Sequence, residues 1–87
     1  MEILWSKRSL SAVRSIRSER FSEEETQTYR ANLMRTAIDK IRKLKKTFVS
    51  NQYPDTYLVR VDSYIFSYRY LENDRILVTT IKHMKQK

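Results

Sequence analysis

The chain has 87 residues, and its 18 Lys and Arg against 10 Asp and Glu give a formal net charge of +8. This length predicts a single domain over residues 1–87 with one thin hydrophobic core. The sequence contains no cysteine and one histidine, which excludes disulfides and thiolate chemistry and argues against a metal site. It also contains no glycine, which excludes the glycine-rich loops that bind nucleotide phosphates and leaves Asn and Asp for turn positions with positive φ.

No apolar run approaches the ~20 residues that a membrane span needs, and the N-terminus lacks the apolar stretch of a secretion signal. We therefore expect a cytoplasmic protein without a membrane partner, a cofactor or a small-molecule ligand. The excess of positive charge on so small a domain attracts polyanions. The expected partners are accordingly nucleic acid, the ribosome or an acidic protein.

The first part of the chain predicts a short strand followed by a helix. Residues 1–5 (MEILW) are apolar and β-prone. Ser6 is a suitable N-cap for a helix that carries Leu10, Val13 and Ile16 on one side.

A second, longer helix is predicted to begin after Ser22, because Ser22 and Glu25 form a capping box and three successive glutamates suit the positive end of the helix dipole. Its apolar positions recur every three or four residues, which predicts a buried stripe: Tyr29, Leu33, Ala37, Ile41, Leu44 and Phe48. Residues 50–55 (SNQYPD), with the only proline, predict a loop.

The remainder of the chain predicts three strands joined by tight turns. A two-residue turn at residues 62–63 would set these pairs opposite each other: Val61 and Tyr64, Val59 and Phe66, and Tyr57 and Tyr68. A second two-residue turn at residues 73–74 would set the following pairs opposite each other: Glu72 and Arg75, Tyr70 and Leu77, Tyr68 and Thr79, Phe66 and Ile81, and Tyr64 and His83.

In this register one face of the sheet is aromatic and apolar, and we expect it to form the core together with the two helices. The opposite face is too polar to be covered by helices: Leu58, Arg60, Ile65, Ser67, Arg69, Val78, Thr80 and Lys82. The predicted fold is a two-layer α+β domain of order β-α-α-β-β-β, in which the N-terminal strand and a helical hairpin pack on one face of an antiparallel sheet.

The candidate partner-binding residues are the basic ones of the open face and the C-terminal end: Arg60, Arg69, Lys82, His83 and Lys85. We expect no catalytic residue among them, because arginine and lysine with normal pKa values are poor bases. Histidine is the usual residue for acid–base catalysis at neutral pH, and His83 is the one histidine of the sequence. The register places it opposite Tyr64 on the core side, which favours a structural role.

Several short motifs follow one another in this chain: an opening strand that ends in Trp5-Ser6, a helical hairpin, the strand Tyr64-Ile65-Phe66-Ser67-Tyr68-Arg69, and a terminal Ile81-Lys82-His83 before a basic tail. In this order, over nearly its whole length, the chain resembles the RelE/ParE superfamily of bacterial toxins from type II toxin–antitoxin pairs. The resemblance implies a protein that blocks growth when free and is held inactive by a cognate antitoxin, which we expect to be acidic.

The superfamily has two branches. RelE-like toxins cleave mRNA on the ribosome with basic residues of the open face, but Thr56, Leu58 and Met84 stand at three such positions here and only Arg60 matches. ParE-like toxins poison DNA gyrase and carry no catalytic set, although Tyr57 stands where that branch often has an arginine. We interpret the chain as a ParE-like toxin that acts on DNA gyrase. The alternatives are a RelE-like ribosome-dependent endoribonuclease with a reduced active site and a non-toxic basic nucleic-acid-binding domain.

Overall fold

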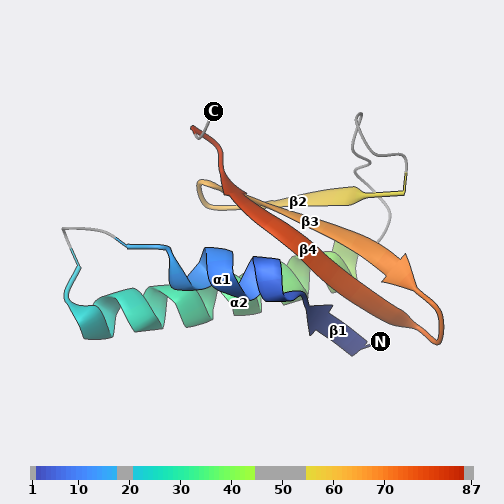
Figure 1. The fold of residues 1–87 in the computed structure, drawn as a ribbon, viewed down its shortest axis with the longest axis horizontal. Helices are drawn as coiled ribbons and strands as arrows, with labels where there is room; N and C mark the ends of the chain where they lie inside the picture. Colours follow the sequence, from blue (N-terminus) through green and yellow to red (C-terminus); the bar gives the residue numbers. More distant parts are fainter. Residues whose placement is uncertain (1, 18–20, 45–54, 86–87) are drawn as a thin grey trace.

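The computed structural model describes residues 2–17, 21–44 and 55–85. Within them the chain forms a strand, two helices and three more strands (Figure 1): β1 (Glu2–Trp5), α1 (Lys7–Arg14), α2 (Glu23–Leu44), β2 (Tyr57–Val61), β3 (Tyr64–Leu71) and β4 (Arg75–His83). This order confirms the predicted α+β fold, β-α-α-β-β-β. The loop predicted at residues 50–55 lies outside the described residues except for Asp55.

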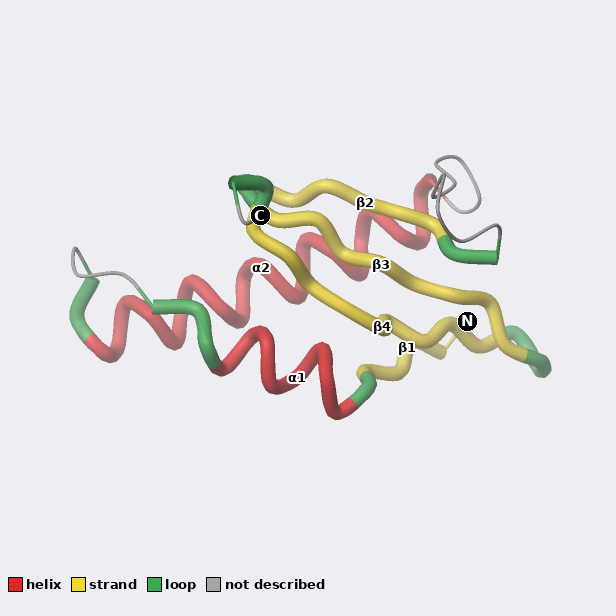
Figure 2. The backbone as a smooth tube through the Cα atoms, turned by 45° about the horizontal axis from the view of Figure 1, so that its top comes forward, coloured by secondary structure: helices red, strands yellow, loops and turns green. Residues whose placement is uncertain are grey.

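The four strands form one sheet in the order β1-β4-β3-β2. β2, β3 and β4 are antiparallel to one another, whereas β1 joins the edge beside β4 and runs parallel to it. The sheet is therefore mixed. A parallel pair of strands needs a long connection, and the chain between β1 and β4 contains both helices as well as β2 and β3. Both helices lie against the same face of the sheet, and no described element covers the other face (Figures 1 and 2). We call this second face the open face.

Ser6 caps α1 as predicted and also ties the helix to β4. The Ser6 Oγ accepts a hydrogen bond from the Ser9 N–H at 3.0 Å, and the same hydroxyl donates to the Thr79 carbonyl at 2.9 Å. Ser9 and Val13 are the buried residues of this helix. The cap therefore fixes both the start of α1 and its position against the sheet.

The capping box at the start of α2 is confirmed. The Glu25 N–H donates to the Ser22 Oγ at 3.2 Å, and the Ser22 N–H donates to the Glu25 Oε1 at 3.1 Å. The hydrogen bond from the Ser22 backbone, followed by the one with its side chain, holds the pKa of the Glu25 carboxyl below its usual value. Two groups that the first helical turn would otherwise leave to water are satisfied in this way.

We expect Ser22→Ala to lower the free energy of unfolding by about 1 kcal/mol, because the Glu25 N–H loses its acceptor. Urea unfolding followed by circular dichroism measures this loss. The matched control is Thr28→Ala on the exposed side of the same helix, which should be neutral or slightly stabilising because alanine has the higher helix propensity. Because the pKa of Glu25 is lowered in the folded protein, its contribution to stability is present above the unfolded-state pKa and is lost as the pH falls. Unchanged stability of Ser22→Ala at pH 7 would contradict the cap.

The core lies between the helices and the inner face of the sheet. From the predicted stripe of α2 the side chains of Leu33, Ala37 and Ile41 are buried, and Tyr29 is partly buried against them. The sheet contributes these buried residues: Val59, Val61, Phe66, Tyr68, Ile76, Val78 and Ile81. The aromatic strand β3 is thus the floor of the core, as predicted. The Leu44 side chain and Phe48 lie outside the described residues.

The β2–β3 hairpin has the predicted register. Val61 pairs with Tyr64 across a turn at Asp62 and Ser63. Asp62 adopts a φ of 56°, a left-handed conformation that aspartate tolerates better than most residues other than glycine. A chain without glycine thus places Asp at this position, as its composition predicts.

The register of β4 near the second turn differs from the prediction. Tyr64 pairs with His83 and Phe66 with Ile81, as expected. Beyond a bulge, however, these pairs replace the predicted ones: Tyr68 with Val78, Arg69 with Leu77, Tyr70 with Ile76, and Leu71 with Arg75. The predicted pairing of Glu72 with Arg75 was therefore wrong, as was the placement of Val78 on the open face.

The physical cause is one extra residue, Thr79, in β4. Ser67 pairs with Thr80 and Tyr68 pairs with Val78, so Thr79 has no partner of its own in the register. The Thr79 hydroxyl donates to the Ser67 carbonyl at 3.1 Å, while the Thr79 carbonyl accepts the Ser6 hydroxyl. The bulge therefore places Ile76 and Val78 on the core side and Leu77 on the open face. The Thr79 carbonyl also holds Ser6, the N-cap of α1.

Buried tyrosine makes stability sensitive to alkaline pH. Burial, and then the neighbouring Tyr70 and Tyr57, raises the pKa of Tyr68 to about 12. A raised pKa means that the folded state keeps the proton that the unfolded chain releases, so stability is complete below the unfolded pKa and is lost as the pH rises toward 12. We expect the wild type to lose stability above about pH 10 and Tyr68→Phe to lose less, with the rest of the loss coming from Tyr29, Tyr64 and Tyr70, whose pKa values are also raised. Parallel alkaline curves for the two proteins would contradict this.

Candidate functional site

The open face carries three exposed cations, one from each of the strands β2, β3 and β4. The register sets Arg60 of β2 opposite Ile65 of β3, and Ile65 opposite Lys82 of β4. Arg60 and Lys82 therefore flank Ile65 in one row. Arg69 lies on the same face of β3, opposite Leu77. All three cations are exposed, so the structure brings together three of the five residues that the sequence predicts for partner binding.

Half-buried aliphatic side chains lie between these cations. Leu77 stands between Arg69 on one side and Leu4 of β1 on the other. The face as a whole presents these half-buried aliphatic residues: Leu4, Leu58, Ile65, Leu71 and Leu77. Apolar contact supplies the affinity of a protein interface, and the charged rim supplies orientation and association rate. The face is therefore suited to a segment that is both acidic and amphipathic.

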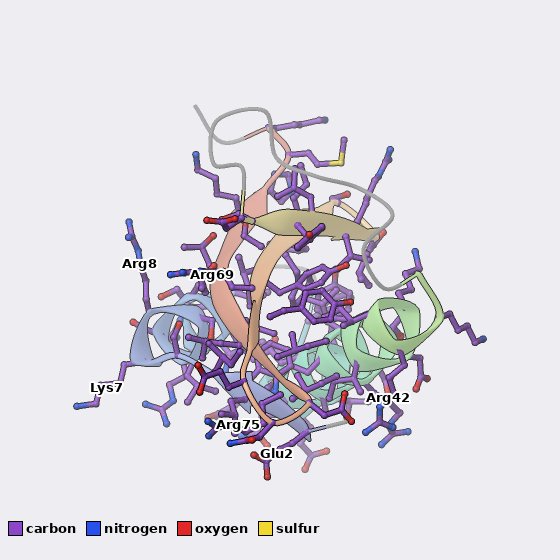
Figure 3. All side chains as sticks on the ribbon, turned by 90° about the vertical axis from the view of Figure 1, so that its right-hand side faces the viewer. Glu2, Lys7, Arg8, Arg42, Arg69 and Arg75 are labelled. Carbon is purple, nitrogen blue, oxygen red and sulfur yellow. The ribbon has the colours of Figure 1, made fainter. Side chains whose placement is uncertain are left out.

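Negative charge is scarce on this face. Among the strand residues of the open face, Glu2 is the one acidic side chain, and it lies opposite Arg75 at the β1 edge. Figure 3 shows Glu2 and Arg75 together at this end of the molecule. The Arg60 Nε donates to the Asp62 carbonyl at 3.3 Å, which holds the guanidinium near the β2–β3 turn. The electrostatic field of the open face is accordingly positive around Arg60, Arg69 and Lys82.

His83 lies on the opposite face from these cations. It pairs with Tyr64, and the two rings meet edge to face with centroids 5.1 Å apart. The His83 Nδ1 accepts the backbone N–H of Lys85 at 3.1 Å. These contacts agree with the predicted structural role, since the ring packs on a neighbour and uses one nitrogen to hold the chain end.

His83 also borders a cavity of about 480 Å³ between the helix ends and the β2–β3 turn. Ile16, Arg17, Phe21, Thr26, Tyr29, Asp62, Ser63 and Tyr64 line the rest of it. The Tyr29 hydroxyl donates to Asp62 Oδ2 at 2.6 Å, and burial together with this bond raises the pKa of Tyr29. The bond connects α2 to the β2–β3 turn, so these residues of the cavity wall stabilise the packing of the helix against the sheet.

The start of the C-terminal tail is attached to the same turn. The Met84 N–H donates to the Ser63 carbonyl at 2.8 Å. Lys85 is exposed beyond it, which places the fifth predicted partner-binding residue at the β2–β3 end of the molecule. Residues 86 and 87 lie outside the described residues.

The chemistry available on the open face is binding of anions. Arginine and lysine bind carboxylate and phosphate groups well but do not accept protons near neutral pH. Within residues 2–17, 21–44 and 55–85 no cluster of acidic and histidine side chains is arranged to hold a metal ion. Over the same residues, no helix is long and apolar enough to cross a membrane.

Sequence reasoning missed that Leu77 and Leu4 belong to the open face. The run Ile76, Leu77 and Val78 is apolar throughout, so it does not indicate by alternation which residue faces the helices. Two adjacent residues with positive φ, Asn73 at 62° and Asp74 at 57°, form the turn with Glu72. An Asn-Asp pair suits a two-residue turn equally well, so it does not indicate the three-residue connection that shifts the register by one.

Comparison with known proteins finds a similarity of fold. No protein-family model matches the sequence, and no curated protein matches it either. Among solved structures, the chain is similar to a chain of the chromosomal ParDE TA (toxin–antitoxin) system from P. aeruginosa, with a TM-score of 0.62 and 9% sequence identity. The similarity covers 98% of this chain and 97% of that one. The two chains therefore share one architecture over their full lengths despite dissimilar sequences.

Proposed function

We propose that this chain is the toxin component of a type II toxin–antitoxin pair and that it inhibits growth by poisoning DNA gyrase. The observation that carries the proposal is the end-to-end similarity of fold to a chain of a ParDE system. The open face supports it, because exposed cations and aliphatic side chains without a proton-accepting partner are suited to binding and not to catalysis.

A cognate antitoxin neutralises the toxin in this proposal. Its acidic, amphipathic segment lies over the open face, where Arg60, Arg69 and Lys82 attract its carboxylates and the aliphatic residues between them bury its apolar side. His83 contributes indirectly by holding the chain end through the Lys85 N–H. Lys85 then extends the positive surface toward the β2–β3 turn. Both partners act in the cytoplasm.

Expression of the chain alone in bacteria tests the proposal. A gyrase poison leaves broken DNA, so we expect arrested growth, filamentous cells and an induced DNA-damage response while translation continues at first. Phe66→Ala, which removes a fully buried side chain, tests whether the effect needs the folded protein. This variant should be harmless. Normal growth with abundant folded protein would contradict the proposal.

A second candidate is the ribosome-dependent endoribonuclease. The row that contains Arg60 and Lys82 on either side of Ile65 favours it, because long cationic side chains on strands about 10 Å apart can reach one phosphate from both sides. In the same expression experiment this function would stop translation at once and leave cleaved mRNA without DNA damage. Arg60→Gln with Lys82→Gln would then abolish cleavage in a protein that remains folded, because both side chains are exposed.

A further inference from the structure

α1 carries a second basic surface, which is separate from the open face. Its exposed side chains are Lys7, Arg8, Ser11 and Arg14, with Ser15 at the C-cap. At 3.6 residues per turn these positions fall within about a third of the helix circumference and extend over roughly 10 Å. We call them the α1 basic face. From residue 7 to residue 17 the sequence contains no acidic residue at all.

The placement of Lys7 and Arg8 is not explained by helix stability, although Arg14 in the last turn suits the helix dipole. Lys7 and Arg8 stand in the first turn of α1, where the helix dipole disfavours cations, and no acidic residue accompanies them. α2 follows the opposite and favourable arrangement, with glutamates in its first turn and Arg42 and Lys43 in its last. The positive end of the α1 dipole therefore adds to the field of Lys7 and Arg8 instead of being offset.

The composition of the α1 basic face differs from that of the open face. The open face has half-buried aliphatic residues between its cations. On α1 the exposed side chains are all cations and hydroxyls, and the half-buried Leu10 and Ala12 lie outside the arc that they occupy. A protein partner gains most of its affinity from buried apolar contact, which this face does not offer. Phosphate groups, in contrast, are bound by Arg and Lys together with hydroxyls such as that of Ser11. The Ser15 hydroxyl already donates to the Ser11 carbonyl at 2.9 Å.

We propose that the α1 basic face binds the phosphodiester backbone of a nucleic-acid duplex. The roughly 10 Å between its first and last cation equals the rise of about three phosphates of one strand along the duplex axis. Contacts of this kind position a protein without reading bases, so binding is independent of sequence. Figure 3 shows Arg8 on the same side as Arg69 of the open face, and Arg42 of α2 on the other side.

Fluorescence anisotropy of a labelled duplex of about 20 base pairs, titrated with the purified chain between roughly 50 and 200 mM salt, tests this proposal. The variant is Arg8→Gln with Arg14→Gln. The matched control is Arg35→Gln with Arg42→Gln on α2, which also removes two exposed charges, one of them again in the last turn of a helix. Both proteins should melt close to the wild type, because these side chains are exposed.

For the α1 variant we expect the slope of log affinity against log salt to become less steep by about two, and the affinity at low salt to fall at least roughly tenfold. The control should keep nearly the wild-type slope and affinity. Duplex DNA and duplex RNA of one sequence are measured in parallel. The duplex that binds with the higher affinity identifies the nucleic acid that supplies the phosphates.

Three results would overturn the inference: no binding of either duplex by the wild type at low salt, equal losses in the α1 variant and its control, or a loss confined to Arg60→Gln with Lys82→Gln. The last result would transfer the phosphate contacts to the open face, and the first would leave an acidic protein as the partner of α1. A chain that arrests growth but binds no duplex would refute this inference and leave the proposed toxin function intact.

Discussion

Replacing Phe66 with alanine should lower the free energy of unfolding by about 3–5 kcal/mol. Phe66 is 0% exposed and lies in the central part of β3, paired with Val59 on one side and Ile81 on the other. Its ring meets the edge of Trp5 at 6.1 Å, so the truncation opens a cavity that several elements border. A domain of this size has only about 5–10 kcal/mol of stability in all.

Urea unfolding of Phe66→Ala, or its fraction folded at 25 °C, measures this effect. Phe21→Ala is the matched control, because Phe21 is 40% exposed and its main aromatic contact is the tilted ring of Tyr29. The control should lose far less stability than Phe66→Ala. If the two variants unfolded at similar urea concentrations close to the wild type, the aromatic side of β3 would not be the core.

Reversing the charge of Arg60 and Arg69 to glutamate should slow association with an acidic antitoxin by more than roughly tenfold at low salt. Both side chains are exposed on the open face, so the substitutions change the field that steers the partner without removing a buried contact. The salt dependence of the association rate should weaken as well, because fewer attractive charges remain to be screened.

Stopped-flow or surface-binding measurements with an acidic antitoxin determine this association rate. Arg35→Glu with Arg42→Glu on α2 changes the net charge by the same amount on the helical side and should affect the rate much less. If the open-face variant and this control behaved alike, the total charge would matter and the open face would not be the docking surface.

The elements and one hairpin could be predicted from the sequence because their signals are local. Ser22 and Glu25 lie three residues apart, and the capping box that they form is a property of that spacing. The β2–β3 register follows from alternation in residues 57–61 and 64–70 together with one Asp that accepts a positive φ. The placement of Arg60 and Arg69 on one face follows from this alternation, and the pairing of Ile65 with Lys82 adds the third cation.

The register of β4 beyond the bulge could not be predicted in the same way. Ile76, Leu77 and Val78 are all apolar, so either parity would bury a good side chain. The choice depends on a tertiary contact, because the extra residue Thr79 accepts the Ser6 hydroxyl, which lies 73 positions away in the sequence. A local pattern contains no information about such a contact.

The α1 basic face was overlooked for a different reason. Cations on a short helix are usually read as a solvated surface, and only the comparison with α2 shows that Lys7 and Arg8 oppose the helix dipole. The sequence did contain the signal, since no acidic residue occurs between positions 7 and 17. The separation of this helix from the open face, in contrast, required the fold.

The most direct test of the toxin proposal is a cleavage assay with purified DNA gyrase, supercoiled plasmid and the purified chain. We expect linear DNA to accumulate with increasing protein once the trapped complexes are denatured, and to disappear when an acidic antitoxin is added first. Phe66→Ala, which we expect to be strongly destabilised, should produce much less. Supercoiling and cleavage that remain unchanged at protein concentrations well above that of gyrase, with the chain folded, would contradict gyrase as the target.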